Sequence, residues 1–333
     1  MTMSAPRRRQ LSILDVGHGN CAVLADDRGT VVIDAGPGST LLEFLVDAGI
    51  SSIDVVLISH ADEDHLGGLI AVLGSKRFKI GRVRLNSDAL KGSAVWDDLL
   101  HELNACDKAG SLDWQTSLTF DKSGQFDQGS IRIEILAPSK YLAAKGPGGT
   151  DGKGRRVSTN SISAVVRLLQ GNEPVALLAA DLDRVGFDDL VDSGQEARAP
   201  IAVFPHHGGR PASADAVAFT RAFCQLVTPT TVLFSIGRGR HATPVPDIVA
   251  AVLTFSPTCR IACTQLSEHC AAALPRRKAR HLEKVFARGR ERGQCCAGSL
   301  VLYLDKVPIL MPSVPSHQAF IRRAASTALC RRG

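Results

Sequence analysis

Short apolar runs recur along the chain and alternate with segments of helical periodicity. The first runs are rich in β-branched residues and are broken by Gly and Asp, which predicts an antiparallel meander over Leu11–Val16, Ala22–Ala25 and Thr30–Asp34. A helix follows, with Ser39 or Thr40 as its N-cap. The chain therefore begins as a block of strands closed by a helix.

Strand and helix patterns alternate through the rest of the chain. Apolar runs predict strands at Ile53–Ser59, Val83–Leu85, Ile131–Leu136, Ser163–Leu169, Val175–Ala180, Ile201–Phe204, Val232–Ile236, Arg260–Cys263 and Leu300–Leu304. Helical spacing of apolar residues predicts helices over Leu66–Leu73, Ala89–Ala109, Ala212–Phe223 and Pro246–Leu253. Because each half begins with strands and continues with strand–helix alternation, we expect an α/β fold in which helices cover a pair of sheets.

The composition is that of an ordinary folded protein. The chain has 333 residues, of which 44% are hydrophobic and 22% charged, and this usage excludes a disordered, collagenous or coiled-coil chain. Apolar stretches such as Val175–Ala180 are far shorter than the roughly 20 residues of a membrane span. We expect no membrane association. The odd number of nine cysteines and the absence of a leader-like segment after Arg7–Arg9 predict a cytoplasmic protein with reduced thiols.

The positive charge is concentrated in a few segments. The net charge is +6, and the segment Arg276–Arg292 holds eight Lys or Arg against two Asp or Glu. Leu282, Val285 and Phe286 have helical spacing there, which predicts an amphipathic basic helix. Its cationic face would consist of Arg277, Arg280, Lys284, Arg288 and Arg292. Such a face suits the phosphate backbone of a nucleic acid, and a solvated helix or a docking surface for a protein partner are the alternatives.

The densest group of chemically active side chains lies between Ser59 and Gly68. Two imidazoles and three carboxylates follow one another there, in the turn that leaves an apolar strand. In a tight turn alternate side chains share a side, so His60 and Asp62 can hold one ion while the adjacent Asp-His pair reaches a second. Nitrogen and oxygen ligands without thiolate suit Zn²⁺, Mn²⁺ or Fe. A solvated acidic loop with incidental histidines is the alternative.

This segment, His-x-Asp-x-Asp-His after a core strand, resembles the signature of the metallo-β-lactamase superfamily. With Asp in its second place it is similar to the hydrolase domain of bacterial competence DNA-uptake proteins of the ComEC type. Further resemblances follow in family order over residues 11–305, at Leu14–Asn20, Val32–Gly36, Asn160-Ser161, Ala180-Asp181, Pro205–Gly208 and Gly239–His241. The resemblance implies a four-layer αββα sandwich with its site at one edge between the sheets.

The resemblance also implies two divalent ions, Zn²⁺ or Mn²⁺, and a set of ligands for them. Asp181 would bridge the two ions, and either His206 or His207 would complete the second site, with His206 preferred. Asn160 stands where the superfamily has a third histidine, which leaves the first ion short of a protein nitrogen. The implied ligands are His60, Asp62, Asp64, His65, Asp181 and His206.

Metal-dependent hydrolysis is the activity that the resemblance implies, and a phosphodiester in nucleic acid is the preferred substrate. The reaction would use a hydroxide activated by two metal ions, oriented by Asp64 or Asp181, with His207 or His241 as the acid. One fold hosts many chemistries, so a small ester, lactone, thioester or cyclic nucleotide is the alternative substrate. A metal-stabilised scaffold that binds nucleic acid or a protein is the alternative outside catalysis.

The remaining candidates support the site or lie apart from it. Asp15 and Asp34, at strand ends beside glycines, either orient ligand imidazoles or cap loops. A group of four cysteines is a candidate structural zinc site or a set of core residues: Cys263, Cys270, Cys295 and Cys296. We expect a basic arm over 1–10, one hydrolase domain over 11–311 with a basic insertion at 271–295, and a poorly ordered Arg-rich tail over 312–333.

Overall fold

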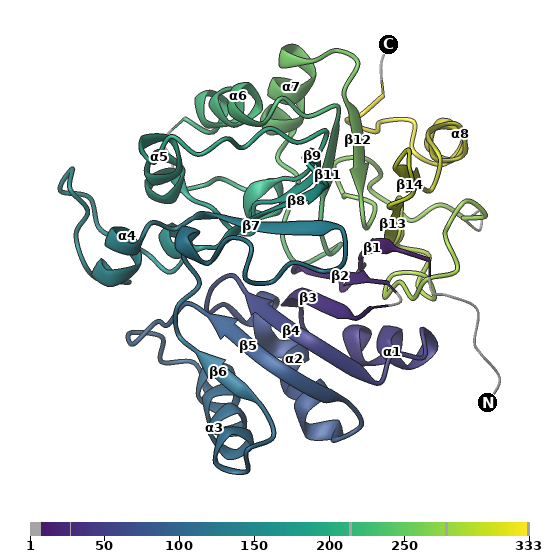
Figure 1. The fold of residues 1–333 in the computed structure, drawn as a ribbon. Coiled ribbons are helices and arrows are strands. Elements are labelled where there is room, and N and C mark those ends of the chain that lie inside the picture. The colour runs from purple at the N-terminus through teal and green to yellow at the C-terminus, as the bar shows by residue number, and fades with distance from the viewer. Residues whose placement is uncertain (1–7, 27, 213–214, 277–278, 332–333) are drawn as a thin grey trace.

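Two β-sheets lie face to face in the computed structural model, which describes residues 8–26, 28–212, 215–276 and 279–331 (Figure 1). The first sheet has, in spatial order, β14 (Ile309–Met311), β13 (Leu300–Tyr303), β1 (Gln10–Ile13), β2 (Cys21–Ala25), β3 (Thr30–Ala35), β4 (Ser52–Ile58), β5 (Lys79–Leu85) and β6 (Asp113–Gln115). The second has β12 (Arg260–Cys263), β11 (Thr231–Phe234), β10 (Ile201–Val203), β9 (Glu173–Leu178), β8 (Val165–Gln170) and β7 (Ile131–Ala137).

The helices lie on the outer faces of the two sheets (Figure 1). The first sheet is covered by α1 (Thr40–Asp47), α2 (Glu63–Ser75) and α3 (Ala94–Lys108). The second is covered by α5 (Arg184–Asp192), α6 (Ala216–Val227), α7 (Pro246–Phe255) and, at one side, α8 (Val314–Ala324). A short helix, α4 (Lys140–Lys145), follows β7. The predicted four-layer αββα sandwich is confirmed.

Three apolar clusters hold these layers together, and alternation along the strands assigns each side chain to one of them. In β3, Ile33 belongs to the cluster between the two sheets, whereas Val32 points the other way, into the cluster under α1 to α3. The third cluster lies under α5 to α8 and includes five buried phenylalanines: Phe187, Phe204, Phe219, Phe223 and Phe234. Because the central strands are covered on both faces, they read in the sequence as continuous apolar runs.

Most of the predicted elements recur in the structure, and three of the recurring helices have shifted starts. The helix expected from Leu66 is α2, which begins at Glu63. The helix expected from Ala89 begins at Ala94, where the Ser93 side chain accepts a hydrogen bond from Trp96 N–H. The helix expected from Ala212 begins at Ala216, with Asp215 as its N-cap. A polar cap at the observed start satisfies a helix N–H group that would otherwise be unpaired, which explains the boundaries at Ala94 and Ala216.

The predicted basic helix is wrong. The described residues of the segment Arg276–Arg292 form turns and one isolated bridge, and Arg277 lies outside the described residues. The N–H of Gly289, which a helix would bond to a carbonyl four residues earlier, instead donates to a carboxylate oxygen of Asp15 at 2.9 Å. Tertiary hydrogen bonds of this kind override a helical pattern that Gly289 itself already weakens.

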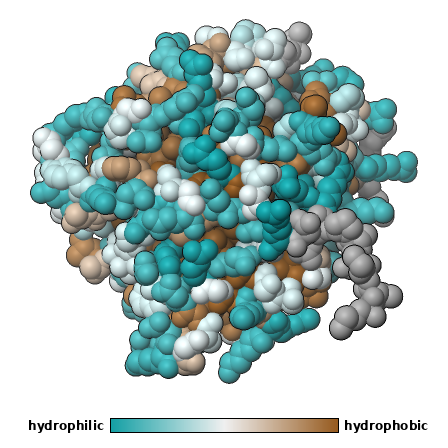
Figure 2. Space-filling view, viewed as in Figure 1, coloured by the Kyte–Doolittle hydropathy of each residue, from teal (hydrophilic) through white to brown (hydrophobic). Residues whose placement is uncertain are grey.

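The C-terminal segment also differs from the expectation of poor order. Residues 314–324 form α8, and Ile321, Ala325 and Ala328 are buried in the cluster under α5 to α8. No helix among the described residues is long and apolar enough to cross a membrane. On the face drawn in Figure 2, hydrophilic residues cover most of the surface and hydrophobic ones show between them.

Candidate metal centre

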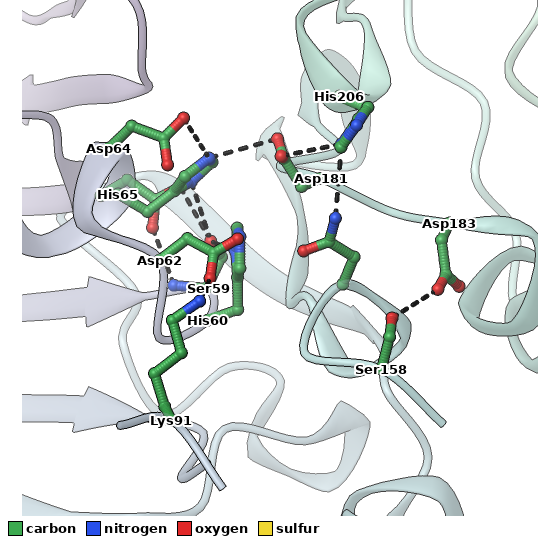
Figure 3. A network of polar contacts seen from close by, with 12 residues as sticks. Ser59, His60, Asp62, Asp64, His65, Lys91, Ser158, Asp181, Asp183 and His206 are labelled. Carbon is green, nitrogen blue, oxygen red and sulfur yellow. Dashed lines mark hydrogen bonds and ion pairs between the residues drawn. The ribbon is translucent and has the colours of Figure 1, made fainter. Parts of the chain in front are cut away.

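The clustered motif residues meet at one edge of the sandwich, where strands of both sheets end. Ser59 and His60 follow β4 of the first sheet, and Asp64 and His65 lie in the first turn of α2. Asp181 lies three residues beyond the end of β9 of the second sheet, opposite them (Figure 3). Crevices outside the carboxyl ends of strands are where α/β folds place their ligands.

Four side-chain atoms converge at this edge, one each from Asp64, His65, Asp181 and His207. All four lie within 4.8 Å of one another. Nε2 of His65 and Nε2 of His207 each lie 3.2 Å from Oδ1 of Asp181, and Nε2 of His207 lies 3.2 Å from Oδ2 of Asp64. No other group of three or more Asp, Glu, His or Cys meets this criterion in the described part of the chain.

The outer nitrogen of each central imidazole is held by an acceptor. Nδ1 of His65 lies 2.7 Å from a carboxylate oxygen of Asp34, and Nδ1 of His207 lies 2.7 Å from the carbonyl oxygen of Ser235. Since these oxygens can only accept, both Nδ1 atoms carry a proton and donate. In the neutral rings the lone pairs of both Nε2 atoms therefore face the centre, as in metal sites where an outer carboxylate or carbonyl fixes the tautomer.

This geometry fits a divalent cation. Nε2 of His65, Nε2 of His207 and Oδ1 of Asp181 are buried and have no hydrogen-bond partner among the described residues. Acceptors that face one another without a donor repel in a buried site, and a cation relieves the repulsion. Ligands about 2.1 Å from a tetrahedral ion lie roughly 3.4 Å apart, which is close to the separations seen here.

Protons take the place of the cation when none is bound. Burial opposes the charges of both His65 and Asp181, but the attraction between them and their neighbours is stronger. Asp34 and Asp181 raise the pKa of His65 well above its ordinary value, and His207 and His65 hold the pKa of Asp181 well below its own. Ion and proton therefore compete for the centre, so acid weakens metal binding.

The two consecutive histidines are directed differently, and the structure reverses the order of preference expected for them. His207 is buried and joins the four-atom group, whereas the His206 side chain is 34% exposed and lies outside it. Nδ1 of His206 instead lies 2.9 Å from Oδ2 of Asp181 (Figure 3). Left-handed backbone at both residues, with φ of 51° and 54°, turns the rings apart. The geometry thus favours His207 over the preferred His206 as a ligand.

The other two expected ligands, His60 and Asp62, border the centre, as does Asn160, which stands where the resemblance implies a histidine. Nε2 of His60 lies 3.5 Å from Oδ2 of Asp62, and Nδ2 of Asn160 lies 3.4 Å from Nδ1 of His206. Oδ1 of Asp62 forms an ion pair with the ammonium of Lys91 (Figure 3). Burial alone would raise the pKa of Asp62, but His60 and Lys91 lower it to about 2.

Glycines next to the ligands allow the surrounding backbone to approach closely. A Cβ on Gly68 would lie 2.4 Å from the carbonyl oxygen of Gly36, so α2 could not pack against β3 with any other residue there. A Cβ on Gly19 would lie 2.3 Å from the carbonyl oxygen of Asp64. These close approaches fix the opening loop, residues 15–20, against the turn that carries Asp64.

The two carboxylates predicted to support the site have separate roles. Asp34 orients His65 and also accepts hydrogen bonds from the backbone and hydroxyl of Ser59, at 2.7 and 3.0 Å. Asp15 does not contact a ligand imidazole among the described residues. It accepts hydrogen bonds from Gly17 N, Gln265 Nε2 and Gly289 N, so it caps the opening loop and ties the basic segment to it.

The cysteine group has the environment of core residues. Cys263, Cys270 and Cys296 are buried in the cluster under α5 to α8, and Cys295 lies beside Asp15. Burial raises the pKa of each thiol. Within the described part of the chain, the four sulfur atoms do not converge as the ligand atoms of a metal site do. The group therefore lacks the features of a zinc site.

Three residues at the centre were missed as site candidates. Ser235 contributes its main-chain carbonyl, and Lys91 comes from a loop beyond β5. No local sequence pattern therefore predicts that either residue belongs to the site. The His18 ring lies 4.3 Å from those of both His207 and His241, and its Nε2 is 3.5 Å from Asp64. Its position between two glycines of the opening loop was the available signal. Through His18, the exposed candidate acid His241 adjoins the centre.

The sequence profile of the family described as "Metallo-beta-lactamase superfamily" matches residues 14–214. The chain belongs to this superfamily. Membership places it among metal-dependent hydrolases, in agreement with the four-residue centre.

Individual relatives are distant. The chain is 22% identical over 254 residues to ComE operon protein 3 of Bacillus subtilis (strain 168), a match that covers 70% of this chain and 29% of that protein. The metallo-beta-lactamase fold protein YhfI of Bacillus subtilis is 10% identical with a TM-score of 0.48, covering 78% of this chain and 96% of YhfI. Igni18, a metallo hydrolase of Ignicoccus hospitalis, is 13% identical with a TM-score of 0.44, covering 78% and 97%.

Proposed function

We propose that this superfamily hydrolase cleaves phosphodiester bonds in nucleic acid. The observation that carries the proposal is the place of the basic segment Arg276–Arg292. Arg288 donates from its backbone to Asp15 and from its guanidinium to the carbonyls of Val16 and Pro37. These bonds hold the opening loop, residues 15–20. Within that loop, the N–H of Asn20 donates a hydrogen bond to the carbonyl oxygen of Asp64.

A polyanion that reaches the centre therefore passes a neighbouring cationic segment. Exposed cations of this segment include Arg280, Lys284 and Arg292. Binding to successive phosphates releases counterions and strengthens the complex. A small ester fits within the centre and does not contact charges outside it. The guanidinium of Arg288 also holds loop carbonyls.

In the proposed reaction, Asp64, His65, Asp181 and His207 would hold a divalent ion, Zn²⁺ or Mn²⁺. When bound, the ion would supply Lewis acidity and lower the pKa of a water molecule to about 7. Asp64 and Asp181 would orient the nucleophile by accepting its hydrogen bonds. Both nitrogens of His207 are engaged, so the exposed His241 is the remaining predicted proton donor to the leaving group.

The test is hydrolysis of defined substrates by the purified protein with Mn²⁺ or Zn²⁺. Linear, circular and single-stranded DNA and RNA are compared with a p-nitrophenyl ester, a lactone, a thioester and cyclic nucleotides. We expect cleavage of nucleic acid that Asp181→Ala abolishes, and cleavage of the circle would indicate an endonuclease. Turnover of the small substrates alone would overturn the nucleic-acid proposal.

Salt dependence of binding separates the basic segment from the centre. Replacing Arg280, Lys284 and Arg292 with Gln should weaken DNA binding and reduce its salt slope by about one unit for each phosphate that the variant no longer neutralises. The three residues are exposed, so folding should be unaffected. An unchanged slope would remove this segment from the binding surface.

A further inference from the structure

A lysine side chain of the protein itself, Lys91, lies in the half of the site formed by His60 and Asp62. The ammonium of Lys91 pairs with Oδ1 of Asp62, while Oδ2 of Asp62 faces Nε2 of His60 at 3.5 Å. Lys91 is 29% exposed and Asp62 24%, so the pair lies at the rim of the centre. In Figure 3 the Lys91 side chain extends from its loop to the Asp62 carboxylate.

The loop that carries Lys91 is held in place by several hydrogen bonds. Its first residue, Asn86, is buried and bonds the main chain of Leu118 and Ile162. Asp88 then forms a turn, accepting from Leu90 N–H at 2.9 Å and from Lys91 N–H at 3.2 Å. Lys91 is therefore presented from an ordered turn.

The same half of the site offers few ligands for a divalent ion, namely Oδ2 of Asp62 and the buried Nε2 of His60, which has no hydrogen-bond partner among the described residues. Asn160 supplies an amide at the position where the sequence resemblance implies an imidazole. The second oxygen of Asp181, which a bridging carboxylate needs, faces Nδ1 of His206 at 2.9 Å. An ion at His60 and Asp62 would therefore share the Asp62 carboxylate with the ammonium of Lys91 and the Asp181 carboxylate with the His206 ring.

From this arrangement we propose that Lys91 acts as a built-in competitor for the second metal ion. The protein then takes up one divalent ion tightly at the four-residue centre, and the ammonium of Lys91 supplies positive charge where a second ion would lie. The inference rests on the proposed metal-dependent function and deepens it. The sequence predicts two ions. The inference adds that one is held tightly and that Lys91 weakens the binding of the other.

The test is the number of ions bound, measured without substrate. Metal-free protein is dialysed against graded Mn²⁺, bound manganese is determined by elemental analysis, and pairs of coupled ions are detected by electron paramagnetic resonance. We expect the wild-type protein to bind one ion before the second is detected. Lys91→Met, which keeps the length of the side chain and removes its charge, should bind the second ion at least about tenfold more tightly and show the coupled spectrum.

Two matched variants control for charge and fold. Lys91→Arg keeps the positive charge and should bind metal like the wild-type protein. Lys153→Met removes an ammonium that pairs with Asp192 at 2.8 Å on the exposed surface, and it should change nothing. Equal stoichiometry and affinity in wild type and Lys91→Met would overturn the inference while leaving the metal centre intact. If no variant bound Mn²⁺ or, in a repeat, Zn²⁺, the proposed function itself would fail.

Discussion

Replacement of Asp34 by Asn tests whether a buried carboxylate sets the protonation of a metal ligand. Asp34 accepts three hydrogen bonds, two from Ser59 and one from Nδ1 of His65. Asn has the same shape and tolerates the left-handed φ of 57° at this position, so the backbone need not change. It offers only one acceptor oxygen.

The structure indicates which hydrogen bond the variant gives up. If the amide oxygen keeps the bond to Ser59 N–H, the amide NH₂ faces Nδ1 of His65 and donates to it. The ring proton then moves to Nε2, which points at Oδ1 of Asp181 at 3.2 Å. The reversed amide would place NH₂ against the Ser59 N–H, and an unsatisfied buried donor costs about 1–3 kcal/mol.

The expected result is a loss of metal affinity with little loss of stability. Removing a partner that orients a ligand imidazole costs about 10–100-fold in affinity, and this corresponds to about 1.4–2.7 kcal/mol. Calorimetric titration of the metal-free protein with Zn²⁺ measures the change, and urea unfolding measures stability.

A matched variant controls for the removal of any buried carboxylate. Asp26 is also buried and caps the turn between β2 and β3, accepting from Arg28 N and Gly29 N, so Asp26→Asn should affect stability and leave Zn²⁺ affinity unchanged. Wild-type affinity in Asp34→Asn, or equally weakened affinity in both variants, would refute the reasoning.

The remaining predictions concern the paired histidines and the C-terminal helix. His207→Ala should lower Zn²⁺ affinity far more than His206→Ala in the same titration, because only His207 joins the four converging atoms; the opposite order would restore His206 as the ligand. His317, a buried residue of α8, has its pKa lowered to about 3 by burial. The unfolded chain therefore binds more protons, and stability falls as pH drops from about 6.5 toward 3, by about 2 kcal/mol between pH 7 and 5. Urea unfolding at both pH values measures this, and a pH dependence unchanged in His317→Phe would contradict it.

Most of the strands, most of the helices and the ligand turn follow from local sequence, whereas the short edge strands β6 and β14 were not predicted. Apolar runs such as those of β4 and β9 define strands locally, since burial on both faces requires a continuous run. The spacing of His60, Asp64 and His65 places all three in a single turn, whatever packs around it. At Gly68 only Gly leaves room for the close approach to the carbonyl oxygen of Gly36.

The partners that these residues meet depend on tertiary packing. The choice of His207 over His206 depends on left-handed backbone and on the carbonyl of Ser235, 28 residues away in the chain. Lys91 reaches Asp62 across 29 residues, and Gly289 bonds Asp15 across 274. Side-chain periodicity reports which face of an element is buried, but it carries no information about the distant group that satisfies a buried hydrogen bond or charge. For that reason the basic segment could be mistaken for a helix, whereas the metal-binding turn, whose geometry is local, could not.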